Sequence, residues 1–410
     1  MRNARNTAAC LFAALTIAFA LSQPAAACPF CAAPSLTLSE QLAMADAVVL
    51  VQWVDGKMTK GQVAGNTVYT IESVLKGPED LLKKGDKIAL ARYRVGKKGD
   101  QFILMGTRGT VIEWGSPLEV TKTSYKYLAN APGPKEPQKK RLAYYLKYLE
   151  FPDQLVSNDA FAEFANADYK DITMLADVMP RDRIRKWVGS DDTPVTRLGF
   201  YGLLLGLCGE KEDAALMRNV IIEPSDDFRL GIDGVMSGYL LLTGKAGLDE
   251  IDRTKLTTKI LLDKEGKPVL DKEGNTTPLP FSETYAAMQA LRFMQRFAPK
   301  VIEQKRLKQS MRILLDRPEL ADLVIADLAR WKDWDVQDKL MKLYGADEYN
   351  VPSIKRAIIR YMLVSTKDIP DDLSSSSEPA HVVAGKKHLA TLEKKDPKTV
   401  REAKRFFFLQ

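Results

Sequence analysis

Two cysteines near the start of the chain, Cys28 and Cys31, have the most specific chemical spacing in the sequence. A Cys-x-x-Cys pair can exchange disulfides, supply two ligands to a zinc site, or close a local disulfide. Redox exchange needs the pair at the start of a helix that follows a strand, and zinc needs further ligands; neither accompanies this pair. Ala32 stands where a c-type haem site has histidine. We therefore expect a structural disulfide and no cofactor or metal.

Histidines and adjacent acids are the other side chains that could do chemistry. His381 and His388 are the only histidines, and we expect both in a solvated tail. Their position excludes a histidine-dependent triad or a histidine-rich metal site in the main domains. Adjacent acids occur at Asp191-Asp192, Asp226-Asp227 and Asp371-Asp372. Catalysis of the glycosidase type requires two acids that face each other across a cleft, so an enzyme with catalytic carboxylates stays an alternative.

Composition restricts the class of protein. The chain has 410 residues, of which 45% are hydrophobic, and this length is typical of two or three folded units. The composition excludes collagen, wholesale disorder and a disulfide-rich miniprotein. The formal net charge is +7, which is too small to indicate a nucleic-acid partner.

The first 27 residues have the three parts of a secretory signal in order. Arg2 and Arg5 precede the apolar run 8–21, and three alanines then lead to a cleavage site before Cys28. The apolar run is short for a bilayer, which needs about 20 residues. We expect cleavage and a periplasmic or secreted protein without a transmembrane segment. Lipid anchoring at Cys28 is the less favoured alternative, because lipoprotein signals usually have Leu where this chain has Ala25.

Residues 28–130 are predicted to form a compact, mostly β domain. Thr37 and Glu40 match a capping box, which predicts a short helix through Ala45. Strand-like runs separated by turn residues follow at Ala47–Val54, Thr67–Leu75, Lys87–Tyr93, Gln101–Met105 and Val111–Trp114. Strands this short and this closely spaced predict a small barrel.

The order of several residues resembles netrin-like domains. The residues are Cys28, Cys31, Ala45-Asp46-Ala47-Val48-Val49, Tyr69-Thr70-Ile71-Glu72, Val74, Lys76-Gly77 and Gly85-Asp86. The resemblance implies an OB-type barrel. The family includes the tissue inhibitors of metalloproteinases, in which the amine and carbonyl of an N-terminal cysteine occupy the metal of the protease. The resemblance thus implies that a mature N-terminal Cys28 could inhibit a metalloprotease, although family members commonly begin Cys-x-Cys.

A proline-rich segment, 131–137, is predicted to be a linker, because its three prolines disfavour both helix and central strand. Beyond it the apolar period becomes helical, so residues 138–370 are predicted to be almost entirely α. The predicted helices include 155–166, 170–178, 211–222, 282–297, 300–315, 319–331, 335–343 and 352–365. The predicted fold class is therefore α+β, with a β-barrel domain followed by an all-α domain.

A faint internal repeat occurs in the helical part. Arg197-Leu198-Gly199-Phe200-Tyr201-Gly202 aligns with Arg229-Leu230-Gly231-Ile232-Asp233-Gly234 at an offset of 32 residues. Gly206 then aligns with Gly238. The offset is about one helical pair and resembles HEAT-like repeats, which form α-solenoids. Glycines that recur on one helical face predict close approach of two helices.

The end of the chain, 371–410, is predicted to be a flexible joint followed by a basic helical tail. That tail could rest on an anionic surface or dock on the helices of the same chain. From these features we expect an exported, non-enzymatic binding or scaffold protein that holds a protein or an envelope polymer on its helical surface. Carboxylate catalysis and protease inhibition through Cys28 are the alternatives.

Overall fold

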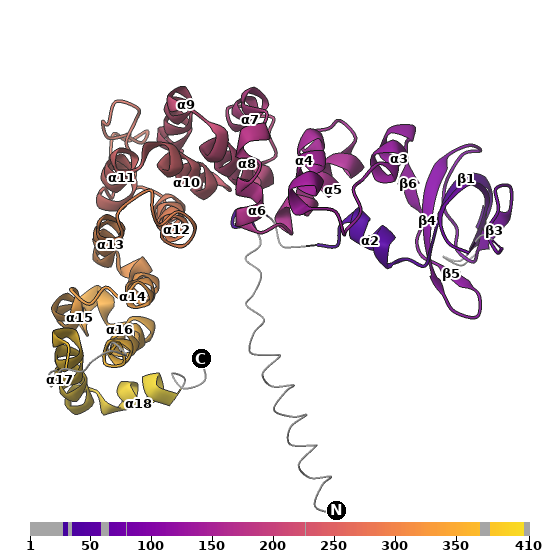
Figure 1. The fold of residues 1–410 in the computed structure, drawn as a ribbon. Coiled ribbons are helices and arrows are strands. Elements are labelled where there is room, and N and C mark those ends of the chain that lie inside the picture. The colour runs from indigo at the N-terminus through magenta and orange to yellow at the C-terminus, as the bar shows by residue number, and fades with distance from the viewer. Residues whose placement is uncertain are drawn as a thin grey trace, which may run out of the picture. The chain divides into compact units, whose positions relative to one another are not determined.

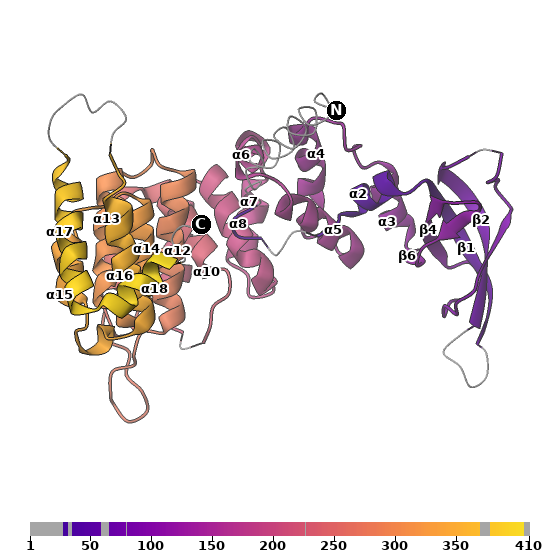
Figure 2. The same cartoon turned by 90° about the horizontal axis from the view of Figure 1, so that it is seen from below.

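The computed structural model describes residues 28–31, 35–58, 65–78, 80–225, 227–369 and 378–405 (Figures 1 and 2). The predicted signal 1–27 lies outside these residues, as do 371–377 and 406–410 of the predicted tail. The chain divides into two compact units, Met1–Met179, which we call the sheet unit, and Pro180–Gln410, the helical unit. The fold is α+β, as predicted. The division falls after Met179, so the first helices after the proline-rich segment belong with the sheet, and the boundary at 131–137 stays a prediction.

Six antiparallel strands form one open sheet in the sheet unit. They are β1 (Ala47–Met58), β2 (Gly65–Lys76), β3 (Lys87–Leu90), β4 (Gln101–Arg108), β5 (Ile112–Trp114) and β6 (Leu118–Val120). The strand order is β3-β2-β1-β4-β5, and β6 also pairs with β4. The five predicted strands are confirmed, whereas β6 was not predicted. Within the described residues no ladder joins β3 to β5, so closure of a barrel is not part of the observed sheet.

One face of this sheet forms the hydrophobic core of the unit. Side chains along a strand alternate between its two faces, so Val49 and Val51 of β1 point the same way. They cluster with residues of β2 and β4, among them Ile71, Phe102 and Leu104, and all five are at most 1% exposed. Val48, Leu50 and Ile103, whose side chains point to the opposite face, are also at most 3% exposed, so both faces of the sheet are buried where β1 and β4 pair.

Five helices accompany the sheet. They are α2 (Leu38–Met44), α3 (Lys122–Ala129), α4 (Gln138–Tyr145), α5 (Gln154–Ala165) and α6 (Tyr169–Thr173). The predicted capping box is confirmed at the start of α2: Thr37 accepts the amide of Glu40, and the Glu40 carboxylate accepts the amide of Thr37. Helix α3 was not predicted, because it falls inside the stretch assigned to strands. It begins with a second capping box, formed by Thr121 and Ser124.

The helical unit consists of helices that pack on one another in chain order. They are α7 (Arg181–Val188), α8 (Val195–Cys208), α9 (Lys211–Ile222), α10 (Ile232–Thr243), α11 (Lys245–Ile251), α12 (Phe281–Phe297), α13 (Gln304–Ile313), α14 (Ala321–Arg330), α15 (Gln337–Leu343), α16 (Pro352–Ser365), α17 (Ala380–Lys395) and α18 (Pro397–Arg405). Figure 1 shows α8, α10, α12, α14 and α16 following one another in one row of this unit, with α7, α9, α11 and α13 in a second row. Contacts join α8 to α10, α10 to α12, and α14 to α16.

The repeated glycines lie where α8 and α10 cross. A Cβ atom at Gly234 would overlap the backbone of Gly199, and one at Gly238 would overlap the carbonyl of Gly202. A Cβ at Gly206 would in turn meet the backbone of Gly238. The predicted close approach of two helices is confirmed, since side chains at these positions would force the helices apart.

Two local features of the helical unit lie at the start of α8 and after α11. The hydroxyl of Thr193 donates to the carbonyl of Trp187, and Pro194 occupies the cap position of α8. The polar insertion 258–280 contains isolated β-bridges at three places. None of the described helices has the length and apolarity to cross a bilayer.

Candidate functional site

The cysteine pair is a disulfide, Cys28–Cys31, in a turn where the Cys31 amide donates to the Cys28 carbonyl. Cys28 is 7% exposed. An inhibitory N-terminus at Cys28 depends on cleavage of residues outside the described part, so this role stays a prediction. Cys208 is a free thiol at the end of α8, half-buried, and burial raises its pKa to about 11. A thiol in that range stays protonated at neutral pH and is a poor nucleophile.

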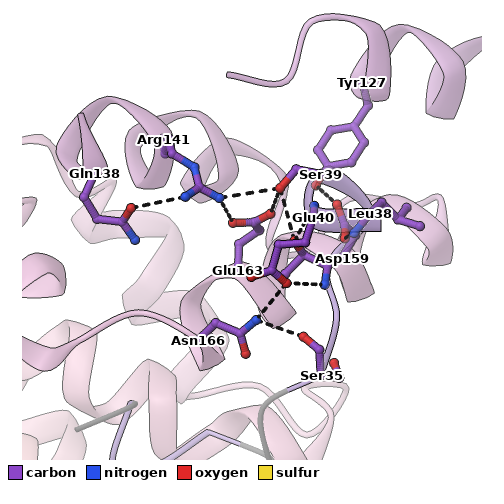
Figure 3. Close-up of polar contacts among 11 residues, drawn as sticks. Ser35, Leu38, Ser39, Glu40, Tyr127, Gln138, Arg141, Asp159, Glu163 and Asn166 are labelled. Atoms are coloured by element: carbon purple, nitrogen blue, oxygen red, sulfur yellow. Dashed lines mark hydrogen bonds and ion pairs between the residues drawn. The ribbon is translucent and has the colours of Figure 1, made fainter. Parts of the chain in front are cut away.

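A buried polar cluster joins α2, α3, α4 and α5 in the sheet unit (Figure 3). Its two central acids, Asp159 and Glu163, lie one turn apart on α5 and are 7% and 3% exposed. One oxygen of Asp159 accepts the backbone amide of Leu38 at 2.7 Å, and the other accepts the hydroxyl of Tyr127 at 2.7 Å. Asp159 therefore ties the first turn of α2 and the body of α3 to α5.

Glu163 extends the cluster towards α4. It accepts a hydrogen bond from the hydroxyl of Ser39 and pairs with Arg141 at 2.8 Å. On the other side of α2, the amide of Asn166 donates to Glu40 at 3.4 Å (Figure 3). Four helices thus share one hydrogen-bonded network, in which every carboxylate has at least one donor from another element.

The ionisation of Asp159 follows from this environment. Burial raises the pKa of Asp159 to about 6, although the hydrogen bonds from Leu38 and Tyr127 act in the opposite direction. Burial and the nearby Asp159 charge raise the pKa of Tyr127. Both donors to Asp159 are neutral, so they satisfy the carboxylate without compensating its charge. The cluster therefore contains an acid that changes its protonation state close to pH 6.

An acid with a raised pKa is also what general acid catalysis uses. Here, however, both oxygens of Asp159 and both oxygens of Glu163 are occupied by donors of the same chain. The arrangement suits an anchor that holds α2. These two acids were not predicted from the sequence. Their spacing of one turn, next to the apolar residues of α5, was the available signal.

An apolar groove of about 920 Å³ lies beside this cluster in the sheet unit. Its lining comes from α2, α3, the ends of β1 and β2, and the proline-rich segment: Ser39, Leu42, Ala43, Val48, Leu75, Lys76, Leu128, Ala129, Ala131, Pro132, Gly133, Pro134, Lys135 and Glu136. The ammonium of Lys76 donates to the Ala43 carbonyl at 2.8 Å, where a cation complements the C-terminal end of α2. The predicted linker is therefore one wall of a groove.

The helical unit buries an acid with different partners. Glu283, on α12, is 1% exposed and binds two cations, Arg229 and Lys255, each at 2.6 Å. Burial alone would raise the pKa of Glu283, but the hydrogen bonds and charges of Arg229 and Lys255 hold it below its ordinary value. Burial lowers the pKa of Lys255. Lys255 belongs to a π-helical turn, Asp252–Thr257, a conformation often found at functional positions.

Further ion pairs connect successive helices of the unit. They include Arg181–Asp213, Arg185–Asp213, Arg218–Glu250, Arg306–Asp249, Arg306–Asp252, Arg292–Asp327, Arg312–Asp333, Lys332–Asp368 and Arg356–Glu402. Several acids in this set are almost fully buried, such as Asp213 at 0% and Asp327 at 2%. Because each is paired, the charged residues hold neighbouring helices together.

The histidines were expected in a solvated tail, and this expectation is wrong. His381 lies on α17, where its ring stacks on Trp334 with centroids 5.7 Å apart. His388 is 16% exposed and lies 3.1 Å from an oxygen of Asp338. The tail packs on the unit because it is amphipathic, and its apolar face, including Val382 and Leu392, is buried.

The adjacent acids predicted as possible catalysts do not converge. Asp191 and Asp192 are exposed in the turn between α7 and α8, and Asp227 is also exposed. Asp226 and the pair Asp371-Asp372 lie outside the described residues. In the part of the chain that the structure describes, no group of three or more His, Cys, Asp or Glu side chains is arranged to hold a metal.

Comparisons with protein-family models, with curated proteins and with solved structures found no match for this chain. The resemblances to netrin-like domains and HEAT-like repeats therefore rest on the residues quoted above.

Proposed function

We propose that the chain is an exported, non-enzymatic binding or scaffold protein that holds a protein or envelope partner on its helical unit. In this proposal the sheet unit is a netrin-like, OB-type barrel, and the helical unit is a HEAT-like α-solenoid. The repeat offset supports the second assignment: Arg181 pairs with Asp213 and Arg218 pairs with Glu250, each across 32 residues. Gly206 and Gly238, which meet between α8 and α10, are also 32 residues apart.

The observation that carries the proposal is a set of exposed apolar side chains on the helical unit. Phe228 is 71% exposed, Phe281 is 52% exposed and Leu230 is 42% exposed. The ring of Phe281 also stacks on Tyr285, with centroids 5.8 Å apart. Single exposed apolar residues are common, but aromatic residues held in a rigid setting are the usual energetic centres of protein interfaces.

These residues sit beside the buried ion cluster, which makes their setting rigid. Arg229 follows Phe228 in the chain, and it binds Glu283, which lies on α12 two residues after Phe281. Arg229 also donates to the carbonyls of Val220 and Ile221 at the end of α9. The ion pair therefore joins the two segments that carry the aromatic side chains, and less conformational entropy is lost when a partner binds.

A test uses the full mature chain and its native envelope fraction. The wild type and the double variant Phe228→Ala/Phe281→Ala would each be immobilised, and the captured proteins and polymers would be quantified by mass spectrometry. We expect at least tenfold less of the specifically captured partner on the double variant, since aromatic centres of interfaces contribute about 2 kcal/mol or more each.

A matched control removes exposed apolar side chains from the sheet unit. Val95 and Val111 are 72% and 70% exposed, so Val95→Ala/Val111→Ala should leave capture unchanged. If this control loses the partner and the helical variant keeps it, the sheet unit binds, as the inhibitor alternative requires. If the wild type turns over a substrate and loses that activity on replacement of a carboxylate, the enzyme alternative replaces this proposal.

A further inference from the structure

A second cavity, of about 430 Å³, lies between α14 and α16 in the helical unit. One stripe of each helix lines it, at the spacing of one helical face, including Leu323, Ala326 and Arg330 from α14 and Arg356, Ala357 and Arg360 from α16. Figure 2 shows the two helices side by side, and they are in direct contact. We call this cavity the arginine groove. Its volume falls in the range of small-molecule sites, about 300–1,000 Å³.

The three arginines of the groove differ in their partners. Arg330 binds Asp327 at 2.9 Å, and the other oxygen of Asp327 binds Arg292 at 2.6 Å. Arg356 lies 3.8 Å from Glu402 of α18, at the outer limit of an ion pair. For Arg360 the described part of the chain provides no ion pair, and its Nε is buried without a hydrogen-bond acceptor.

The buried Nε of Arg360 has no acceptor in the described part of the chain, and an unsatisfied buried donor costs free energy, so an acceptor placed there would be stabilising. Among the described residues, Asp322 is the only acid that lines the groove, and its carboxylate accepts the amide of Leu323 in the first turn of α14. Helix amides at that end already stabilise its charge. Arg360 is therefore the arginine of the groove for which the described residues provide no acid.

We propose that the arginine groove binds a single-chain monocarboxylate, with the carboxylate on Arg360 and the hydrocarbon chain along the apolar floor. The planar guanidinium fork of arginine matches a carboxylate with two parallel hydrogen bonds. Leu323, Ala326, Ala357 and Val364 supply an apolar surface that excludes water from the chain. One unpaired arginine favours one negative charge, so a monocarboxylate fits better than a polyanion. This site is separate from the aromatic surface proposed for the partner.

The test uses the full mature chain and laurate as the probe, in isothermal titration calorimetry below the micellar concentration. We expect saturable binding of one laurate per chain. Acetate has the carboxylate without the chain, and dodecyltrimethylammonium has the chain with the opposite charge, so neither should give saturable binding. Equal affinity for dodecyltrimethylammonium, or no binding of laurate, would overturn the proposal.

Variants locate the site. Arg360→Met keeps an apolar stem and should weaken laurate binding at least tenfold, whereas Arg253→Met, at an arginine 55% exposed outside the groove, should leave affinity unchanged. Ala326→Phe fills the groove and should abolish binding with the far-ultraviolet circular dichroism unaltered. If both groove variants fold and bind laurate like the wild type, laurate binds elsewhere and the proposal is wrong.

Discussion

Asp159 in the sheet unit and Glu283 in the helical unit are both buried acids, 7% and 1% exposed, yet their pKa values shift in opposite directions. Asp159 receives its two hydrogen bonds from a backbone amide and a tyrosine hydroxyl, which are neutral. Glu283 receives its hydrogen bonds from Arg229 and Lys255. The two acids are therefore held by different means, neutral donors at Asp159 and cations at Glu283.

The comparison shows that burial does not by itself decide whether an acid is charged. Burial disfavours the charged form at both sites, and the nature of the donors decides the outcome. A buried carboxylate with cations nearby stays ionised and depends on them, whereas one with neutral donors becomes sensitive to mildly acidic pH.

The largest effect is expected from Glu283→Ala. The substitution leaves Arg229 and Lys255 buried without their anion, which typically costs about 3–5 kcal/mol of stability. Hydrogen exchange of peptides from α10 and α12, followed by mass spectrometry, measures the loss within the helical unit. Lys255→Met should cost less than half as much, because a matched Arg229–Glu283 pair remains. A loss under about 1 kcal/mol for Glu283→Ala would mean that the cations find other partners.

The next effect concerns the pH dependence of the sheet unit. The folded pKa of Asp159 is about 6, and the unfolded value is about 3.9, so the folded state binds the extra proton between these pH values. The stability from this group is therefore present at low pH and is lost as pH rises towards and through 6, by about 2–3 kcal/mol. The stability difference between wild type and Asp159→Asn should change by this amount between pH 4 and 7. The pH dependence that Glu283 contributes has the opposite sign, because its contribution to the stability of the folded state is lost as pH falls.

Carbon-13 NMR of the carboxyl groups checks the same prediction directly. The Asp159 signal, assigned by its disappearance in Asp159→Asn, should titrate near pH 6. A midpoint near 4 would show that the neutral donors compensate for burial, and the contrast between the two units would then disappear.

A smaller effect is expected where helices of the helical unit meet through their backbones. Gly234→Ala places a Cβ against the carbonyl of Gly199 and should cost about 1–3 kcal/mol by overpacking. Gly133→Ala is the matched control in the sheet unit, because a Cβ there meets nothing within 4 Å. Thermal unfolding should place the Gly234 variant well below the wild type and the Gly133 variant close to it. Equal midpoints would show that α8 and α10 can separate without penalty.

The smallest effect is expected at the cap of α2. Thr37→Ala removes the acceptor for the Glu40 amide and should cost about 1 kcal/mol. Because Asp159 also holds the first turn of α2, exchange of the α2 amides should increase more in Thr37→Ala/Asp159→Asn than the sum of the single changes. Thr391→Ala, at an exposed position within α17, should change stability by less than about 0.5 kcal/mol. Strict additivity would mean that the two contacts act independently.

The sequence by itself determined the local structure. Strand-like runs separated by turn residues located five strands, the Thr37 and Glu40 pair located the start of α2, and the glycines at an offset of 32 located the crossing of α8 and α10. These patterns predict structure because the contacts behind them join residues that are close in the sequence or that recur at a fixed period.

Only the tertiary structure decided which polar side chains meet. Ser39 and Glu163 are 124 residues apart in the chain, and Arg229 and Glu283 are 54 apart, so no local pattern relates them. No local pattern predicted the position of His381 either. The basic composition of the tail led us to expect it in solvent, whereas in the structure its ring stacks on Trp334. Burial and the identity of the hydrogen-bond partners both depend on long-range packing. Together they decide whether each buried acid is charged. Long-range packing also leaves the Nε of Arg360 without an acceptor among the described residues.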